Sequence, residues 1–422
     1  MNVLDKALLK IYGKNDIILK NQQKRYRHLA DIFKQKFGDN ELHYFSTPGR
    51  TEISGNHTDH NNGRVLAASI NLDSIAAVTK NNENKVILYS EGFDDPFIVD
   101  LSQLKIIQEE KETTFALIRG IAARFKQLRY EVGGFNAFMT SDVLPGSGLS
   151  SSASVEILIG TIFNALYNEN TISPEELAKI GQYAENEYFG KPCGLMDQMA
   201  CAVGGIISID FKDPENPIVD KIDFDFDARQ YSLLVVDTGS SHADLTDDYA
   251  NIPKEMKSVA EALDSTVCRE IEYEELITEI KSLRNQIGDR ALLRATHFLA
   301  ESERVWDQVR ALKTGNFQEF LNLVKESGNS SFKWLQNIYS AKNVHDQGVS
   351  LFLAITEKFI SKIGEGACRV HGGGFAGTMQ VFLPNKSIEE YRQLIKKVFG
   401  ENKVMALSIR AFGTVFLSDL EN

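Results

Sequence analysis

The chain has 422 residues and a net charge of −12 at neutral pH, with 46 Lys and Arg against 58 Asp and Glu. This acidic balance argues against a nucleic-acid partner, because binding to phosphate backbones requires a basic surface. The composition, 43% hydrophobic and 25% charged, is that of a globular protein. A chain of this length is expected to form two domains, and its longest apolar run is too short for a membrane span.

The amino-terminal and cysteine patterns predict a cytoplasmic protein. The first residues, "MNVLDKALLKIYGKND", mix charges into the apolar positions and lack the apolar core and cleavage site of a signal peptide. Cysteines occur at four scattered positions without CxxC spacing, which does not make a disulfide framework in so long a chain. We therefore expect a reducing environment and no membrane partner.

The first third of the chain predicts helices followed by strands. Charged, helix-favouring patterns cover 3–12 and 20–37, and the second closes on Gly38 as a helix cap. Short β-like runs separated by Asn- and Gly-rich turns follow between 42 and 101. A helix over about 113–128 comes next, and the strand "GFNAFMT" follows it.

The remaining chain is predicted to be mainly helical. Ser173 begins a capping box with Pro at the first helical position, so a helix starts there and runs towards Tyr188. Long amphipathic helices dominate 253–365. A strand pair and a helix are expected to close the chain.

The stretch "VLPGSGLSSSASVEILIGTIFNALY" (143–167) predicts an anion site at the start of a helix. Its glycines allow backbone N–H groups to approach a phosphate, towards which the first amides of the helix point. Its serine hydroxyls add donors, and one of them can ligate Mg²⁺. The apolar run behind them would hold the helix in place. On spacing alone, a Ser-rich cap on a core helix is an equal alternative, and the Walker pattern G-x-x-x-x-G-K-[ST] is missing.

Two more stretches must be considered together with the serine motif. They are "TPGRTEISGNHTDHNNGRVLAASIN" (47–71) and "RVHGGGFAGTMQVFL" (369–383). With "PGSGLSSSAS" they resemble, in order and spacing, the three signature motifs of the GHMP small-molecule kinases. The sequence is most similar to the galactokinase branch, whose sugar motif reads approximately GRxNxIGEHxDYxxG and whose catalytic stretch reads CGxMDQ; here the latter is "CGLMDQMA" (193–200).

The resemblance covers about 25–420 and implies an α+β fold with the two-domain GHMP-kinase architecture. We expect an N-terminal extension over 1–24 and a ribosomal-protein-S5-like domain over 25–210. A ferredoxin-like, helix-rich domain would follow over 211–422, with the active site between the two domains. The implied reaction transfers the γ-phosphate of ATP, with Mg²⁺, to the anomeric hydroxyl of galactose or a close relative. The implied partners are that sugar and ATP, and the implied assembly is a monomer or weak homo-oligomer.

Catalytic and metal-binding roles are also implied by the resemblance. Asp197 matches the catalytic aspartate, as base or as orienting carboxylate, and Arg50 matches the arginine that steadies it and the moving phosphoryl group. An arginine close to Asp197 would also keep the carboxylate ionised. Ser152 and Glu185 match the Mg²⁺ ligands, which suits an ion that takes few protein ligands besides water and phosphate oxygens.

The remaining binding positions are carried over in the same way. The sugar-binding positions are Asn56, His57, Asp59, Gly194 and, by a looser alignment, Tyr249. The positions for the ATP phosphates are Gly146, Ser147, Gly148, Leu149, Ser150, Ser151, Ser152, Ala153, Gly373 and Gly374, with Gly372 in the same glycine motif. A plain glycine turn between strands is the alternative interpretation of the last motif.

The sugar motif departs from the galactokinase pattern. Glu52 stands where that pattern has Asn, and Asn56 stands where it has a sugar-facing Glu. The Tyr after Asp is His60, and Arg64 enters a turn of small residues. Loss of a carboxylate near the C6 end of the sugar would remove repulsion of an anionic C6 group, and an added His or Arg would attract one. A kinase of galacturonate type is therefore a second hypothesis. His371, directly before the glycines, is unusual for the family and has no assigned role.

A third hypothesis is a sensor that binds sugar and ATP without turnover. Such sensors can lose residues of the serine motif. Here "GLSSSAS" is complete, and both Asp197 and Arg50 are present. These residues favour catalysis.

Overall fold

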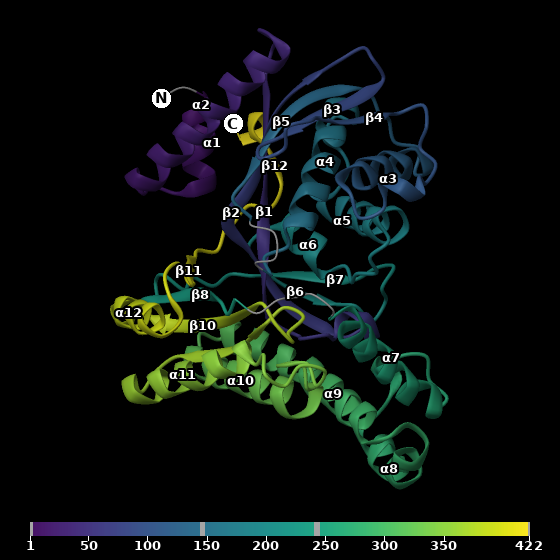
Figure 1. The fold of residues 1–422 in the computed structure, drawn as a ribbon, viewed down its shortest axis with the longest axis vertical. Helices are drawn as coiled ribbons and strands as arrows, with labels where there is room; N and C mark the ends of the chain where they lie inside the picture. Colours follow the sequence, from purple (N-terminus) through teal and green to yellow (C-terminus); the bar gives the residue numbers. More distant parts are fainter. Residues whose placement is uncertain (1–2, 144–147, 240–244, 421–422) are drawn as a thin grey trace.

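The computed structural model describes residues 3–143, 148–239 and 245–420. In this part of the chain the strands form one eight-stranded and one four-stranded sheet. Most of the large sheet lies in the upper half of Figure 1, while its strands β6 and β7 reach the level of the small sheet below; each sheet has its own helices.

The large sheet is built on two long antiparallel strands, β1 (His43–Ser54) and β2 (Arg64–Lys80). Its other strands are β3 (Lys85–Ser90), β4 (Phe97–Asp100), β5 (Phe135–Ser141), β6 (Ile206–Asp210), β7 (Ile218–Ile222) and β12 (Val415–Phe416). The order is β12-β1-β2-β5-β3-β4, with β6 and β7 beside the other end of β2. The sequence predicted only short strands over 42–101. β1 and β2 are longer than predicted because each strand runs through both halves of the molecule and packs against the core of each half.

Residues of β2 alternate between two hydrophobic cores. Ala76 and Val78 face the core beneath one layer of helices, whereas Ile75 and Ala77 face the opposite core. The first layer consists of α3 (Thr114–Gln127), α4 (Ser151–Tyr167), α5 (Pro174–Tyr183) and α6 (Met196–Val203). The second consists of α1 (Val3–Tyr12) and α2 (Asp16–Phe37), on the other side of the sheet in Figure 1. The predicted N-terminal extension therefore covers a sheet face, and its predicted end at 24 lies inside α2.

The small sheet has the strand order β11-β8-β10-β9, with every pair antiparallel. Its strands are β8 (Tyr231–Asp237), β9 (Ala367–His371), β10 (Thr378–Pro384) and β11 (Val404–Leu407). Its helices are α7 (Thr246–Ala262), α8 (Tyr273–Ile287), α9 (Asp289–Lys313), α10 (Phe317–Ser330), α11 (Gly348–Ile363) and α12 (Ile388–Phe399). One face of the sheet packs on α11 and α12, while the other shares a core with α9, α10 and the ends of β1 and β2.

The end of the chain differs from the predicted strand pair and helix. Two more strands follow α12, and the last of them, β12, returns to the large sheet and pairs with β1. There Phe416 stacks on Phe45 with ring centroids 5.0 Å apart. The division at 210 stays a prediction, since β7 and β12 lie beyond it in the sequence but belong to the large sheet.

A buried carboxylate, Asp73, ties the N-terminal helices and the C-terminal segment to β2. Its oxygens accept bonds from Arg25 (2.8 Å), Arg410 (2.8 Å), the Ser46 hydroxyl (2.6 Å) and the Tyr12 hydroxyl (2.5 Å). Burial alone would raise the pKa of Asp73, but the two arginines outweigh it and the pKa is lowered. Asp73 therefore stays ionised and holds three distant segments together.

We predict that Asp73→Asn lowers the free energy of unfolding by about 3 kcal/mol, because the buried Arg410 loses its counter-charge and Arg25 keeps only Asp142 as a partner. Denaturant titration at neutral pH measures this. Since the pKa of Asp73 is lowered on folding, its stabilisation is complete at neutral pH and is lost as the pH falls below about 4. The control is Asp39→Asn, whose side chain is 85% exposed and whose loss should cost under about 0.5 kcal/mol. Equal stability of Asp73→Asn and wild type would contradict the prediction.

Candidate functional site

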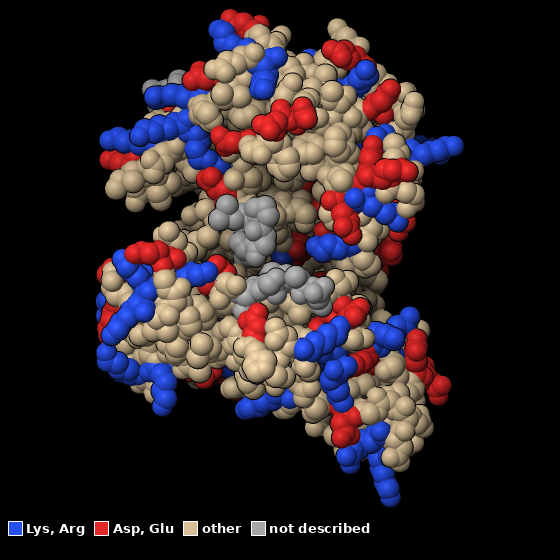
Figure 2. All heavy atoms as spheres, viewed as in Figure 1, with Lys and Arg blue, Asp and Glu red and all other residues tan. Residues whose placement is uncertain are grey.

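The three sequence motifs meet where the two halves of the molecule join. The Arg50 N–H of β1 donates to the Leu149 carbonyl of the serine motif at 3.1 Å. A Cβ on Gly49 would lie 2.8 Å from that same carbonyl oxygen, and a Cβ on Gly148 would lie 2.8 Å from the Thr378 hydroxyl, just after the glycine motif. Backbones therefore approach here as closely as glycine allows. Figure 2 shows the molecule narrowing at the level where its halves join, with charged side chains on either side.

Arg50 and Asp197 form a bidentate ion pair in this region. Arg50 Nε donates to Asp197 Oδ1 at 2.7 Å, and Nη2 donates to Oδ2 at 2.6 Å. Ser150 donates to the same carboxylate, and Arg50 Nη1 donates to the Gly148 carbonyl at 2.5 Å. Asp197 stands in the first turn of α6, and 32% of its side chain is exposed while Arg50 is buried. The pair thus presents a fixed carboxylate to the outside.

The charge state of this pair follows from its surroundings. Burial alone would raise the pKa of Asp197, but Arg50 and the Ser150 hydroxyl outweigh it and the pKa is lowered. Burial would likewise lower the pKa of Arg50, but Asp197 raises it above its ordinary value. Both groups are therefore charged at neutral pH.

Glu185 lies in a π-helical turn, Ala184–Phe189, that follows α5. The sequence predicted one helix from the Ser173 cap towards Tyr188; the cap is confirmed by its bond to the Glu176 N–H at 3.2 Å, but the α-helix ends at Tyr183. The wider turn brings Glu185 inward, to 3% exposure. Single π turns inside helices are frequent at functional sites.

Ser152 and Glu185, predicted as metal ligands, lie side by side. Ser152 Oγ is 3.3 Å from Glu185 Oε1, and Lys191 Nζ is 3.3 Å from the same oxygen. Gln198 holds the other oxygen at 2.8 Å. Two neighbouring ligands of an octahedral ion at about 2.1 Å stand about 3 Å apart, so this donor set fits Mg²⁺. In the described part of the chain, His, Cys, Asp and Glu form no cluster of three or more that could hold a metal, so a site built from protein side chains alone is not seen there.

Two residues of the sugar motif each lie close to a glycine: Asp59 lies against Gly194, and His57 lies against Gly373. A Cβ on Gly194 would fall 1.8 Å from Asp59 Oδ2, so only glycine leaves room for that carboxylate. His57 has a left-handed backbone, with φ +59°, and its Nε2 donates to the Gly373 carbonyl at 2.9 Å. Burial lowers the pKa of His57 to about 3, which keeps the ring neutral. Tyr249 donates to the Gly374 carbonyl at 2.9 Å and thus lies against the same turn.

Asn56, predicted to contact a sugar, is fully buried. Its Nδ2 donates to Glu52 Oε1 at 3.0 Å and to the Gly372 carbonyl at 2.6 Å. Its Oδ1 accepts from Asn337 at 2.7 Å and from Ser331 at 3.3 Å. The structure therefore does not place Asn56 at an open surface. The prediction took its position from the family motif, whereas the bonds in this chain turn the side chain inward.

The predicted phosphate-binding residues surround the start of α4. Gly146 and Ser147 lie outside the described residues. The first backbone bond of the helix is made by the Ser154 N–H to the Ser150 carbonyl, at 3.1 Å. The N–H groups of 151–153 therefore precede the helical ladder and point out of its end. Leu149 and Ala153 have buried side chains, so only their backbone is offered to a ligand.

His371, to which the sequence assigned no role, bridges two of the motifs. Its Nε2 lies 3.0 Å from the Thr51 hydroxyl on β1, and its Nδ1 lies 3.0 Å from the Thr378 hydroxyl on β10. Burial lowers the pKa of His371 to about 3, so the ring is neutral. The sequence indicated only that His371 ends a strand. It could not indicate the role of the ring, because Thr51 lies in a distant segment of the chain.

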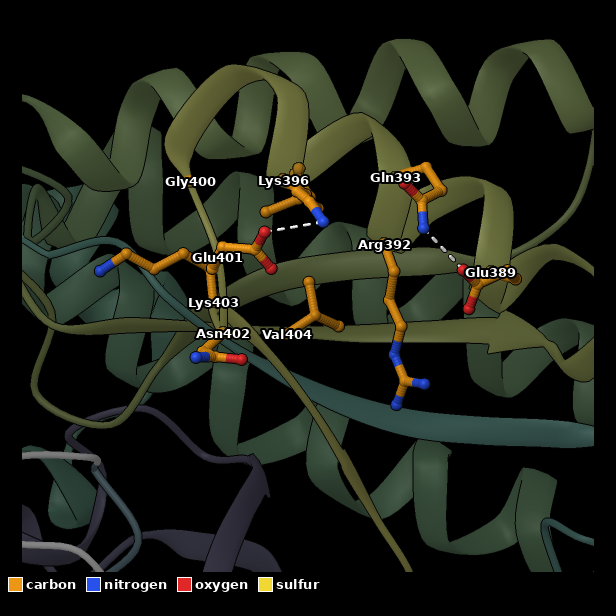
Figure 3. Close-up of a pocket in the computed structure, with 10 residues that line it drawn as sticks. Glu389, Arg392, Gln393, Lys396, Gly400, Glu401, Asn402, Lys403 and Val404 are labelled. Atoms are coloured by element: carbon orange, nitrogen blue, oxygen red, sulfur yellow. Dashed lines mark hydrogen bonds and ion pairs between the residues drawn. The ribbon is translucent and has the colours of Figure 1, made fainter.

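A separate hollow of about 300 Å³ lies between α12 and β11. Figure 3 shows its walls, on which Lys396 pairs with Glu401 at 2.7 Å and Glu389 accepts a bond from Gln393. None of its lining residues belongs to the three motifs. Because most of its lining side chains are exposed and lie away from the motifs, the hollow does not compete with the motif region as the functional site.

Comparisons with known proteins agree with the geometry. Residues 116–205 match the model of the GHMP kinases N terminal domain, and residues 31–80 match the galactokinase galactose-binding signature. The chain is therefore similar to the GHMP kinases, and to galactokinases among them. The galactokinase relatives described below indicate an ATP-dependent phosphotransferase, and the two-domain α+β architecture is the one that the sequence predicted.

Similarity to individual relatives extends over most of the chain. The galactokinase of Lactococcus lactis subsp. lactis (strain IL1403) is 28% identical over 88% of this chain and 91% of its own. That of Glaesserella parasuis serovar 5 (strain SH0165) is 29% identical over 86% and 91%. A solved Lactococcus lactis galactokinase complexed with galactose has a TM-score of 0.79 at 24% identity, covering 93% of this chain and all of its own. Methanococcus jannaschii mevalonate kinase, at 18% identity, covers 88% of this chain and 99% of its own with a TM-score of 0.61. Among the helices that the structure describes, none has the length and apolar character to cross a membrane.

We predict that Gly194→Ala displaces the Asp59 carboxylate by at least about 1 Å, because the added methyl would stand 1.8 Å from Oδ2 and not at a contact distance. A crystal structure of the variant measures the shift, and we expect a loss of about 1–3 kcal/mol in unfolding free energy. The control is Gly160→Ala in α4, where the new Cβ would be 3.4 Å from Leu177 and stability should rise by up to about 1 kcal/mol. An unmoved Asp59 would contradict the prediction.

Proposed function

We propose that this protein is a galactose 1-kinase, which transfers the γ-phosphate of ATP to the anomeric hydroxyl of galactose or a close relative. The observation that carries the proposal is the bidentate ion pair between Arg50 and Asp197. This pair lies between the serine motif and the residues of the sugar motif. Galactokinase relatives at 28% and 29% identity over most of the chain support it, as does the matched galactose-binding signature.

The proposed role of Asp197 is to accept a hydrogen bond from the anomeric hydroxyl and aim its oxygen at phosphorus. Phosphoryl transfer depends more on positioning and electrostatic stabilisation than on covalent chemistry. The lowered pKa of Asp197 favours this orienting role over that of a strong base. Arg50, held by both oxygens of Asp197, places positive charge where the phosphoryl group moves.

The proposed phosphate site is the start of α4 together with the glycine turn. The amides of 151–153, at the positive end of the helix dipole, would hold phosphate oxygens. Gly373 and Gly374 would face them from the other half of the molecule. Ser152 and Glu185 would hold Mg²⁺, which supplies charge neutralisation to the phosphates when bound. Lys191, at the same Glu185 oxygen, adds a positive charge beside this site.

The proposed sugar site uses Asp59, His57 and Gly194 at its opening and Tyr249 at its side. Asp59 offers carboxylate oxygens to sugar hydroxyls, and Gly194 leaves room for it. His57 is neutral, with one nitrogen committed to Gly373, so it contributes no charge. A cytoplasmic location, a monomeric or weakly associated state, and the domain limits at 24 and 210 stay predictions from the sequence.

We predict that Asp197→Asn lowers kcat by about 1,000-fold, because an amide is a weaker acceptor for the sugar hydroxyl and leaves Arg50 without its counter-charge. ADP release with Mg²⁺-ATP and galactose measures it, with circular dichroism to show that the fold is kept. Asp94→Asn, at an exposed surface position, is the matched control and should keep wild-type turnover. Near wild-type kcat in Asp197→Asn would refute the assignment.

We also predict that Glu185→Gln raises the Mg²⁺ concentration needed for half-maximal activity by about tenfold or more, because the neutral amide is a poor ligand for a hard cation. A Mg²⁺ titration at saturating ATP measures this, and binding of Mn²⁺ followed by electron paramagnetic resonance gives a second readout. Glu187→Gln, on the same turn but exposed, is the control. An unchanged titration would show that Glu185 is not a ligand.

A further inference from the structure

A buried polar cluster lies directly behind His57, and two of its members are the positions at which this chain departs from the family motif. Glu52 stands at the place of the motif's Asn, and Asn56 at the place of its Glu. In the structure the two side chains touch, with Asn56 Nδ2 donating to Glu52 Oε1 at 3.0 Å. Carboxylate and amide have therefore exchanged places within a single hydrogen-bonded pair. The pair keeps one of each group.

The exchange keeps the negative charge but moves it inward. Glu52 Oε1 also accepts from Arg369 Nη2 at 2.9 Å, and both side chains are 5% exposed or less. Arg369 Nη1 donates to the Ile53 carbonyl at 2.8 Å, which fixes the guanidinium. A buried carboxylate paired with a buried guanidinium is held in one geometry, because separating them would leave an uncompensated charge.

The amide of Asn56 links this ion pair to the glycine turn. Its Nδ2 donates to the Gly372 carbonyl at 2.6 Å. Its Oδ1 accepts from Asn337, which in turn donates to the Gly373 carbonyl at 3.1 Å. The backbone carbonyl of Asn56 is bonded by His297 at 2.9 Å. Asn56 thus holds both the glycine turn and the backbone next to His57.

We propose that Glu52 and Asn56 are positioning residues, an exchanged carboxylate–amide pair that sets the glycine turn and His57 for sugar and phosphate binding. The pair acts through Gly372, Asn337 and His57 and does not itself touch the sugar. This inference deepens the proposed function and rests on it for its kinetic readout.

The same geometry removes the basis for a preference for a uronic acid. The exchange frees no positive charge, since Arg369 stays paired with Glu52. Arg64, which the sequence offered as a partner for a C6 carboxylate, is bonded to Asp210 and to Glu303, each at 2.8 Å. Asp59 and Asp197 would repel an anionic sugar. A neutral sugar is therefore the expected substrate class.

The test is a double-mutant cycle with E52N, N56E and the full exchange E52N/N56E. N56E places two carboxylates in contact and turns an oxygen onto the Gly372 carbonyl, while E52N leaves Arg369 without its partner. Each single variant should raise the KM for galactose by about tenfold or more with kcat changed less than about threefold, and the exchange should recover most of the loss. Galacturonate should be turned over at least about 100-fold less well than galactose by the wild type. Where a single variant does not fold, the isosteric E52Q and N56D replace it.

The matched control is a second carboxylate–amide pair, Asp213 and Asn216, which is exposed and joined at 3.1 Å. D213N, N216D and D213N/N216D should leave KM and thermal midpoint unchanged. Effects of E52N and N56E that simply add in the double variant would overturn the proposal. So would an N56E variant of wild-type stability that gains selectivity for galactose over galacturonate, which is the result expected from a direct C6 contact.

Failure of the proposed function gives a different result. A wild type that binds ATP but turns over neither sugar would refute the galactose 1-kinase. The proposal for Glu52 and Asn56 is then tested by thermal midpoints. A higher midpoint in E52N/N56E than in both single variants supports the proposal, and losses that simply add overturn it.

Discussion

The bidentate bond between Arg50 and Asp197 is the contact on which the functional region depends. It joins β1 to α6 across 147 residues of sequence, and Ser150 at the start of α4 bonds to the same carboxylate. Because Arg50 is buried, its charge requires a partner at a fixed place, and Asp197 is therefore held where it meets solvent. The geometry of the Asp197 carboxylate is thus set by the need to neutralise a buried guanidinium. The role proposed for Asp197 and the stability of this region depend on one interaction.

A layer of buried polar groups lies where the two halves of the molecule join, beside the apolar core that the halves share. Thr51, His371 and Thr378 form one chain of bonds, and Glu301 accepts from Ser54 at 3.0 Å and from Ser327 at 2.5 Å in another. Buried polar groups are costly unless paired, so such a layer tolerates only one relative placement of its strands. That restriction suits a site assembled from both halves. It fixes β1 against β9 and β10, the strands on either side of the glycine turn, more closely than apolar packing alone would.

Much of the fold follows from local signals in the sequence, whereas the site does not. The Ser173 cap and the Gly38 stop are readable because each satisfies backbone groups within a few residues. The π turn at 184–189 and the two-residue β12 were missed because they depend on partners far along the chain, such as Gln198 for Glu185 and Phe45 for Phe416. The contacts of Asp197 were expected from likeness to a family, not from spacing. The inward orientation of Asn56 could not be predicted, because it is set by Glu52, Gly372 and Asn337 together.

The chain's path explains how so polar a junction stays rigid. β2 pairs with β5 along residues 74–80 and with β6 along 64–68, so one continuous strand belongs to the upper and the lower parts of the large sheet. The chain then returns from the small sheet through Arg410, which bonds Asp73, to β12 beside β1. The two halves are therefore connected twice, once by β2 and once by the segment from Arg410 to β12. Opening the junction would therefore require breaking the Asp73 cluster or bending β2 itself.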